Sequence, residues 1–137
     1  MASNSLYIVM PAYNEEDNLE KVLNDWYAII EKMNDDSRLV IADSGSTDAT
    51  HSILESFKKE HPKLEVISDS GKFHGEKVVH LYKYAIRHGV DFVFQTDSDG
   101  QTLASDFAKL WKQRDKFDAI LGNRKNRGDG KFRSFVE

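Results

Sequence analysis

Cysteine is absent from the 137-residue sequence. This excludes a disulfide framework, a thiolate metal site and a cysteine nucleophile. Long apolar runs are absent too: none approaches the roughly 20 residues of a membrane-spanning helix, and no signal peptide is visible. We therefore expect a cytoplasmic chain without a membrane span, and the inner face of the membrane is an alternative location.

The glycine patterns of phosphate-binding loops are also missing. Neither G-x-G-x-x-G nor G-x-x-x-x-G-K-S/T occurs in the sequence, so the backbone amides of such a loop are not the expected diphosphate site. A G-x-S-x-G nucleophile elbow is missing as well. A bound diphosphate would therefore need a cation to hold it.

The composition is that of a globular domain, with 39% hydrophobic and 31% charged residues. The length predicts a single domain over residues 1–137. The net charge of −4 is uneven, because residues 122–137 contain five basic and two acidic side chains. A basic, partly irregular tail beside an acidic body does not indicate a nucleic-acid partner.

Short apolar runs alternate with helical patterns along the whole chain. This alternation predicts a Rossmann-like α/β fold with a mostly parallel sheet and helices on both faces. The third helix is expected to bury Val78, Val79, Leu81, Tyr82, Ala85 and Ile86. The expected strands are 5–10, 38–42, 64–67, 91–96 and 117–121, and the expected helices begin near residues 15, 48, 76 and 105.

Polar residues follow four of these five strands. They fall at 13–15, 43–48, 97–101 and 123–127. Parallel α/β sheets bind ligands at the carboxyl ends of their strands, where such segments meet. The sequence therefore predicts one ligand site at this edge of the sheet.

Two carboxylates stand one residue apart where the apolar run Phe92–Thr96 ends. Asp97 and Asp99 leave the end of a strand on the same side. Carboxylate oxygens placed there can hold a divalent cation, which in turn can hold a diphosphate. The alternative is a polar turn, since Asp, Ser and Gly are common turn residues. An EF-hand is excluded because the third acidic ligand and the closing Glu are missing.

Asp43 and Asp48 flank the predicted loop after the second strand. An acid in the place of Asp43 can accept hydrogen bonds from a ribose or a base, and we favour this role over a helix cap. For Asp48 we favour the cap.

Four further residues have two interpretations each. Tyr13 stacks on a base or packs within the protein. His74, in a glycine-flanked loop, contacts the ligand or stays outside the site. Arg124 and Arg127 bind phosphate oxygens through their guanidinium groups or belong to a solvated tail.

Several phrases together resemble family 2 glycosyltransferases, the inverting enzymes of GT-A fold. Residues 9–16 (VMPAYNEE) are similar to their opening V-I-P-A-Y-N-E-E, and residues 43–50 (DSGSTDAT) to D-D-G-S-T-D-G-T. Asp97-Ser98-Asp99 resembles their D-x-D motif. Gly122-Asn123-Arg124, followed by Arg127, resembles their G-x-R. Residues 99–101 further resemble the polyprenyl-phosphate and cell-envelope branch.

The resemblance implies a UDP- or GDP-linked sugar donor, transferred in a single displacement. It implies that Mg²⁺ or Mn²⁺ bridges the donor diphosphate to Asp97 and Asp99. The implied nucleotide-binding positions are Pro11, Tyr13, Glu15, Asp43 and Ser44.

The resemblance is incomplete in three places. Ser44 stands where many members have a second Asp, and Ala104 where many have Pro. The general base lies downstream of the fifth strand in the family, and here only Asp129 and Glu137 are acidic in that region. Asp129 is a weak candidate, and we expect a donor-binding fragment that lacks the C-terminal acceptor part.

Two other functions stay open at this point. One is sugar-1-phosphate nucleotidyl transfer, which would require a glycine-rich loop after the first strand. The other is a non-catalytic nucleotide- or metal-binding module used for assembly, in an oligomer. The acceptor, lipid-linked or not, is left undetermined.

Overall fold

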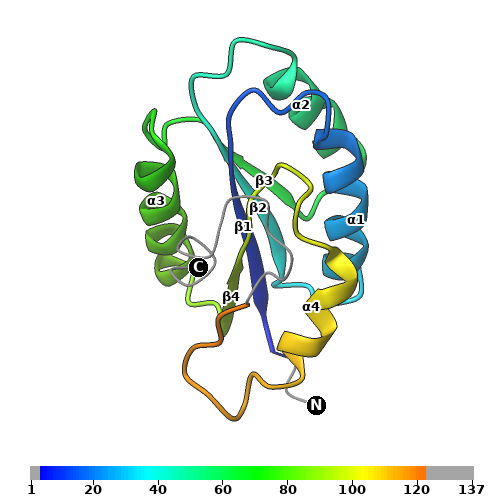
Figure 1. Cartoon of the computed structure of the whole chain (residues 1–137), viewed down its shortest axis with the longest axis vertical. Coiled ribbons are helices and arrows are strands. Elements are labelled where there is room, and N and C mark those ends of the chain that lie inside the picture. Colours follow the sequence, from blue (N-terminus) through cyan, green and yellow to red (C-terminus); the bar gives the residue numbers. More distant parts are fainter. Residues whose placement is uncertain (1–3, 123–137) are drawn as a thin grey trace, which may run out of the picture. The chain divides into compact units, whose positions relative to one another are not determined.

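Four parallel strands form the sheet of the computed structural model, which describes residues 4–122. They are β1 (Leu6–Ala12), β2 (Arg38–Asp43), β3 (Leu64–Ile67) and β4 (Phe92–Gln95). Their order is β3-β2-β1-β4, with β1 and β2 at the centre (Figure 1). The predicted parallel α/β sheet is confirmed.

The chain divides into two compact units, Met1–Thr102 and Leu103–Glu137. The first contains the sheet with α1 (Leu19–Glu31), α2 (Thr50–Glu60) and α3 (His74–Arg87). In the second, the described part contains α4 (Ala104–Trp111). The single domain expected from the length stays a prediction.

Helices cover both faces of the sheet in the first unit. α1 and α2 lie on one face and α3 lies on the other (Figure 1). On the first face, Trp26 of α1 stacks on Phe94 of β4, with 5.5 Å between ring centroids. On the second face, Leu81 and Ala85 of α3 belong to a buried cluster with Tyr7, Val9, Val40, Ala42 and Ile67. Successive side chains of a strand point to opposite faces, so a sheet covered on both faces needs apolar residues at successive positions.

The first strand is longer than expected, because β1 continues through Pro11 to Ala12. On the side of β4, the last paired residues are Val9 and Gln95. Pro11 therefore lies beyond the end of β4, where its missing N–H interrupts no strand pairing. Pro11 is tolerated in a central strand because its neighbour is short.

The first two helices begin later than the sequence suggests. α1 begins at Leu19 rather than near residue 15, and α2 begins at Thr50. The N-cap of α2 is Ala49 rather than Asp48 as expected, but the Asp48 carboxylate still accepts a hydrogen bond from the Thr50 N–H at 2.9 Å. The residues before both helices are used in contacts between loops, described below.

Two predictions about buried segments were wrong. Val79, Tyr82 and Ile86 of α3 are 42–77% exposed, and the buried face of the helix is formed by Lys77, Leu81 and Ala85. Residues 117–121 form no strand, and Phe117 and Leu121 are exposed. An apolar run becomes a strand only where a partner strand is available, and none of the described strands pairs with this run.

Candidate active site

A cleft of about 470 Å³ opens at the carboxyl ends of β1 and β4. This is the size of a small-molecule site. Three segments line it: the end of β1 with the residues after it, the loop into α3 with its first turn, and the residues after β4. The lining residues are Pro11, Ala12, Tyr13, Glu15, Lys72, Phe73, His74, Lys77, Asp97, Ser98 and Asp99.

A buried hydrogen bond fixes the D-x-D segment against β1. The Ser98 hydroxyl donates to the Pro11 carbonyl oxygen at 2.8 Å, and Ser98 is only 3% exposed. The Asp99 carboxylate accepts from the Gln101 N–H at 3.0 Å. Asp97 and Asp99 therefore flank an anchored residue, and both line the cleft.

The cleft concentrates negative charge. Burial raises the pKa of the Glu15 carboxyl, the Asn18 amide opposes this rise, and the carboxylates of Asp99 and Asp97 add to it. Glu15, Asp97 and Asp99 all line the cleft. Three carboxyl groups gathered along one cleft in this way favour a bound cation.

The donor set fits a metal ion that is shared with a ligand. Within residues 4–122, no three His, Asp or Glu side chains are gathered closely enough to enclose a metal by themselves. Magnesium sites with one or two carboxylates usually complete their shell with water and substrate phosphates. Asp97 and Asp99 match that arrangement better than a closed protein site.

His74 lies beside the carboxylate pair, and its contact with a ligand stays a prediction. His74 is the first residue of α3, and its Nε2 lies 3.2 Å from Asp97 Oδ1. Tyr13 is 48% exposed, so its ring is available to a ligand rather than packed in the core. Both residues line the cleft with Pro11 and Glu15.

Lys77 is one of the lining residues that the sequence analysis missed. It is 1% exposed, and its Nζ donates to the Ala12 carbonyl oxygen at 2.7 Å. The ammonium also lies 5.1 Å from the centre of the Tyr13 ring. Burial lowers the pKa of Lys77, and the Asp43 carboxylate partly opposes that shift. The available signal was spacing, since Lys77, Leu81 and Ala85 recur every four residues on one helix face.

The segments after β1 and β2 are joined by hydrogen bonds. We call residues 14–16 together with residues 46–50 the loop clasp. Asn14 adopts a positive φ of 49°. Its Oδ1 accepts from the Thr47 N–H at 2.8 Å, and its own N–H donates to the Ser46 hydroxyl at 3.0 Å. The Glu15 N–H donates to the Thr50 hydroxyl at 2.8 Å. The clasp therefore fixes the backbone on both sides of Glu15.

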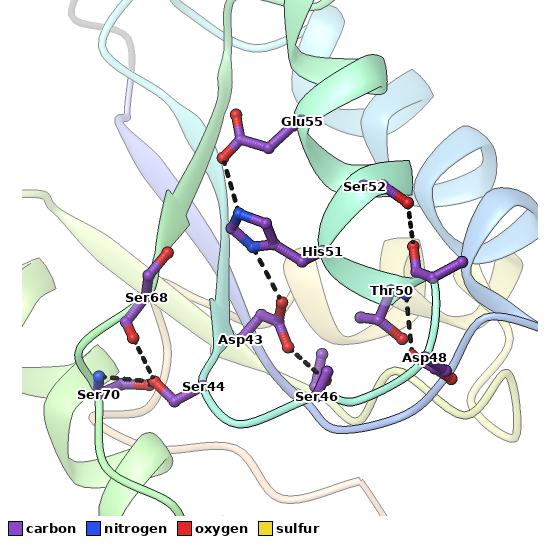
Figure 2. A network of polar contacts seen from close by, with 12 residues as sticks. Asp43, Ser44, Ser46, Asp48, Thr50, His51, Ser52, Glu55, Ser68 and Ser70 are labelled. Carbon is purple, nitrogen blue, oxygen red and sulfur yellow. Dashed lines mark hydrogen bonds and ion pairs between the residues drawn. The ribbon is translucent and has the colours of Figure 1, made fainter.

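Asp43 ends β2 inside a second polar network (Figure 2). Its buried carboxylate accepts from the Ser46 hydroxyl and lies 3.3 Å from His51 Nδ1. The other ring nitrogen of His51 lies 3.7 Å from the Glu55 carboxylate. Thus both carboxylate oxygens of Asp43 meet side chains of the same loop and of helix α2.

Ser44 ties the segment after β2 to the segment after β3. Its hydroxyl donates to the Ser68 carbonyl oxygen at 2.8 Å and accepts from the Ser70 N–H at 2.9 Å (Figure 2). Asp43 and Ser44 lie at the predicted edge of the sheet, yet neither is among the residues that line the cleft.

Three predicted site residues lie outside the described part of the chain: Arg124, Arg127 and Asp129. Between residues 4 and 122, none of the helices combines the length and the apolar character needed to cross a membrane.

Comparison with known proteins identifies the family of the chain. The family described as "Glycosyl transferase family 2" matches residues 7–136. An undecaprenyl-phosphate 4-deoxy-4-formamido-L-arabinose transferase of Pseudomonas fluorescens is 30% identical over 93% of the chain and 38% of its own length. A UDP-N-acetylglucosamine–dolichyl-phosphate N-acetylglucosaminyltransferase of Methanococcus voltae is 27% identical over 90% of the chain and 53% of its own length.

Solved structures show the same fold. The S. aureus TarS fragment in complex with UDP has a TM-score of 0.61 at 20% identity, over 93% of this chain and 38% of that one. The mannosyltransferase PcManGT of Pyrobaculum calidifontis, in complex with GDP-Man and Mn²⁺, has a TM-score of 0.52 at 28% identity, over 72% and 30%. The fold predicted from the sequence is thereby confirmed as that of GT-A glycosyltransferases.

The chain spans between about a third and about half of the length of the curated relatives it matches. The match to the family nevertheless extends over nearly the whole sequence, from the second residue of β1 to residue 136. On that evidence, the chain belongs to glycosyl transferase family 2.

Proposed function

We propose that this chain is the donor-binding part of a metal-dependent, inverting glycosyltransferase. Its cleft binds a nucleoside diphosphate sugar, and the sugar is transferred to a lipid-linked acceptor of the polyprenyl-phosphate class, in cell-envelope glycan or glycolipid synthesis. The observation that carries the proposal is that Asp97, Asp99, Glu15 and Tyr13 line one cleft. An aromatic face and a set of carboxylates are the two features that such a donor needs.

The relatives support both halves of this proposal. Two of them are named as transferases acting on undecaprenyl phosphate and dolichyl phosphate. The mannosyltransferase that is 28% identical was solved with GDP-Man and Mn²⁺. These names supply the donor class, the metal and the acceptor class for the proposal.

Asp97 and Asp99 are the residues that would hold Mg²⁺ or Mn²⁺. When bound, such an ion neutralises charge that develops on a leaving diphosphate. The Ser98–Pro11 hydrogen bond keeps the two carboxylates at the rim of the cleft. His74 contacts Asp97 Oδ1 and restricts the orientation of that carboxylate.

The nucleoside is assigned to the β1 side of the site. Tyr13 offers its exposed ring to a base, since aromatic faces stack readily on planar rings. Asp43, with Ser44 beside it, is proposed to contact the ribose or base. This requires its carboxylate to accept a hydrogen bond in addition to the one from Ser46, while His51 lies 3.3 Å away. Arg124 and Arg127 are proposed as phosphate contacts, and Asp129 stays a weak candidate for the general base.

Calorimetry with UDP and GDP, each with and without Mn²⁺, tests the proposal. We expect one of them to bind, and Mn²⁺ to strengthen binding by about tenfold or more, since each charge-assisted contact contributes roughly 1.5–3 kcal/mol. Asp97→Asn should abolish the Mn²⁺ effect. Asp25→Asn, an exposed acid on α1, is the matched control and should leave binding unchanged.

The proposal fails if neither nucleotide binds in the presence of Mn²⁺. It also fails if Asp97→Asn and Asp25→Asn behave alike.

A further inference from the structure

Lys77 presents a buried positive charge that the Asp43 carboxylate offsets only in part. The side chain is 1% exposed, and its Nζ is bonded to a neutral group, the carbonyl oxygen of Ala12. Among the described residues, no carboxylate forms an ion pair with it. Burying an ammonium group is costly unless an anion accompanies it. The position of Lys77 therefore calls for an anionic partner from outside the protein.

The ammonium group of Lys77 has more hydrogen-bonding capacity than its bond to Ala12 uses. An ammonium group has three N–H donors, and the Ala12 carbonyl accepts one of them. The Tyr13 ring lies 5.1 Å away and offers a cation–π contact, which stabilises the charge without accepting a conventional hydrogen bond. Lys77 is also one of the residues that line the cleft, so its side chain borders the space that a ligand would occupy.

A second feature of the same wall favours an anion. Helix α3 begins at His74, and its N-cap residue Phe73 supplies no side-chain hydrogen bond to the first turn. Phe73 and His74 both line the cleft, so the positive end of a 14-residue helix borders it. Helix N-termini attract anions through their free N–H groups and their dipole.

We propose that Lys77 forms a metal-independent phosphate site in the cleft and binds an oxygen of the donor diphosphate. The inference rests on the proposed function and adds a second contact to it. The carboxylates of Asp97 and Asp99 carry the same sign of charge as phosphate, so they bind it only through a cation. A ligand that meets both the cation and Lys77 needs several separated anionic oxygens, which a diphosphate has and a single carboxylate lacks.

In this arrangement two groups bind the donor diphosphate, the cation and Lys77. The cation at the D-x-D pair depends on metal concentration, whereas the charge of Lys77 is part of the chain. We therefore expect a residual affinity for nucleoside diphosphates in the absence of metal. Because Lys77 also touches Ala12 and faces the Tyr13 ring, it positions the phosphate close to the proposed base-stacking residue.

The test measures binding of UDP and GDP in EDTA, together with the corresponding monophosphates and nucleosides, by calorimetry on the full chain. Lys77→Met removes the charge and keeps an unbranched side chain. Lys83→Met makes the same change at an exposed position of α3 and is the matched control. We expect Lys77→Met to weaken the diphosphate by about ten- to hundredfold, and Lys83→Met to leave it unchanged.

The series of ligands separates a phosphate contact from a general structural role. A phosphate contact predicts a large loss for the diphosphate, a smaller loss for the monophosphate and none for the nucleoside. Equal losses for all three ligands, or no loss for any, would overturn the inference. Lys77→Arg should keep at least part of the affinity, because it retains the charge.

Inorganic pyrophosphate keeps the inference testable if the proposed function fails. In EDTA, pyrophosphate should raise the thermal unfolding midpoint of the wild type and of Lys83→Met, because it binds the folded chain. It should have no effect on Lys77→Met. If pyrophosphate stabilises the wild type and Lys83→Met but not Lys77→Met, and no nucleotide binds, the anion site is supported and the proposed nucleotide-sugar donor is wrong. If pyrophosphate does not stabilise the wild type, the anion site itself is wrong.

Discussion

The loop clasp and the cleft both lie at the carboxyl edge of the sheet, but their polar groups are satisfied differently. In the clasp, Asn14, Glu15 and their partners after β2 exchange hydrogen bonds within the protein. In the cleft, Glu15, Asp97 and Asp99 raise the local negative charge, and Lys77 stands without an ion pair within residues 4–122. One region stabilises the fold, and the other retains charges that a ligand can complement.

This difference separates two kinds of mutational effect. Removing a polar group from the clasp should cost folding stability, because its partner loses a hydrogen bond that the protein supplied. Removing the unpaired charge from the cleft should cost ligand affinity and leave stability nearly unchanged. The following predictions measure that contrast.

Asn14→Ala should have the largest effect on stability. It removes the acceptor of the Thr47 N–H, and it places alanine at φ 49°, where a side chain other than Gly, Asn or Asp is strained. We expect a loss of about 2–3 kcal/mol in the free energy of unfolding, measured by urea denaturation.

Two variants separate these contributions. Asn14→Gly relieves the backbone strain and should recover about 1 kcal/mol of the loss. Asn24→Ala, on the exposed side of α1, should change stability by less than about 0.5 kcal/mol. If Asn14→Ala were as mild as this control, the clasp would not stabilise the fold.

Ser98→Ala should have an intermediate effect, because this serine joins the cleft to the core. The variant leaves the buried Pro11 carbonyl without its donor. We expect a loss of about 1–2 kcal/mol in unfolding free energy, together with weaker Mn²⁺-dependent nucleotide binding. Ser52→Ala removes an exposed hydroxyl that donates to the Ala49 carbonyl and serves as the control. A stable Ser98→Ala protein with intact metal dependence would contradict the proposed anchoring.

Lys77→Met should leave stability at neutral pH within about 1 kcal/mol of the wild type, in contrast to the clasp variants. Removing the buried charge offsets the loss of the hydrogen bond to the Ala12 carbonyl. Burial lowers the pKa of Lys77 in the folded state, so the protonated form is disfavoured there. Between this lowered pKa and the usual lysine pKa of about 10.4, the unfolded chain binds more protons, and wild-type stability rises with pH.

Relative to the wild type, Lys77→Met should therefore become less stable as pH rises through that window. Urea denaturation at neutral and at alkaline pH measures the change. Lys83→Met, on the exposed surface of the same helix, should show no such dependence. A constant difference between Lys77→Met and the wild type at all pH values would argue against a charged, buried Lys77.

Much of this edge of the sheet follows from local sequence patterns. The apolar runs located the four strands, and the carboxylates after the run that contains β4 predicted that Asp97 and Asp99 would border a cleft. Such features depend on a few neighbouring residues. The continuation of β1 through Pro11 was not predictable in this way, because it depends on how far β4 extends beside it.

Features that join distant segments were also missed. The loop clasp requires Asn14 to meet Thr47, 33 residues away in the sequence, and neither residue signals that contact. Lys77 was overlooked because lysine is usually a surface residue, and only its spacing with Leu81 and Ala85 indicates the buried face. Residues 117–121 show the reverse error, an apolar run that finds no partner strand among those described.

Thr96→Val should have the smallest effect, and it tests whether every polar group beside the cleft serves a ligand. Thr96 directly precedes Asp97, and its Oγ1 is buried without a hydrogen-bond partner in the described structure. Valine has nearly the same shape and no hydroxyl to desolvate, so stability should rise by up to about 1 kcal/mol. Thermal unfolding measures the gain, and Mn²⁺-dependent nucleotide binding should stay unchanged. A loss of nucleotide affinity would instead make this hydroxyl part of the site, and the boundary between structural and ligand-directed polar groups would then lie one residue earlier, at the end of β4.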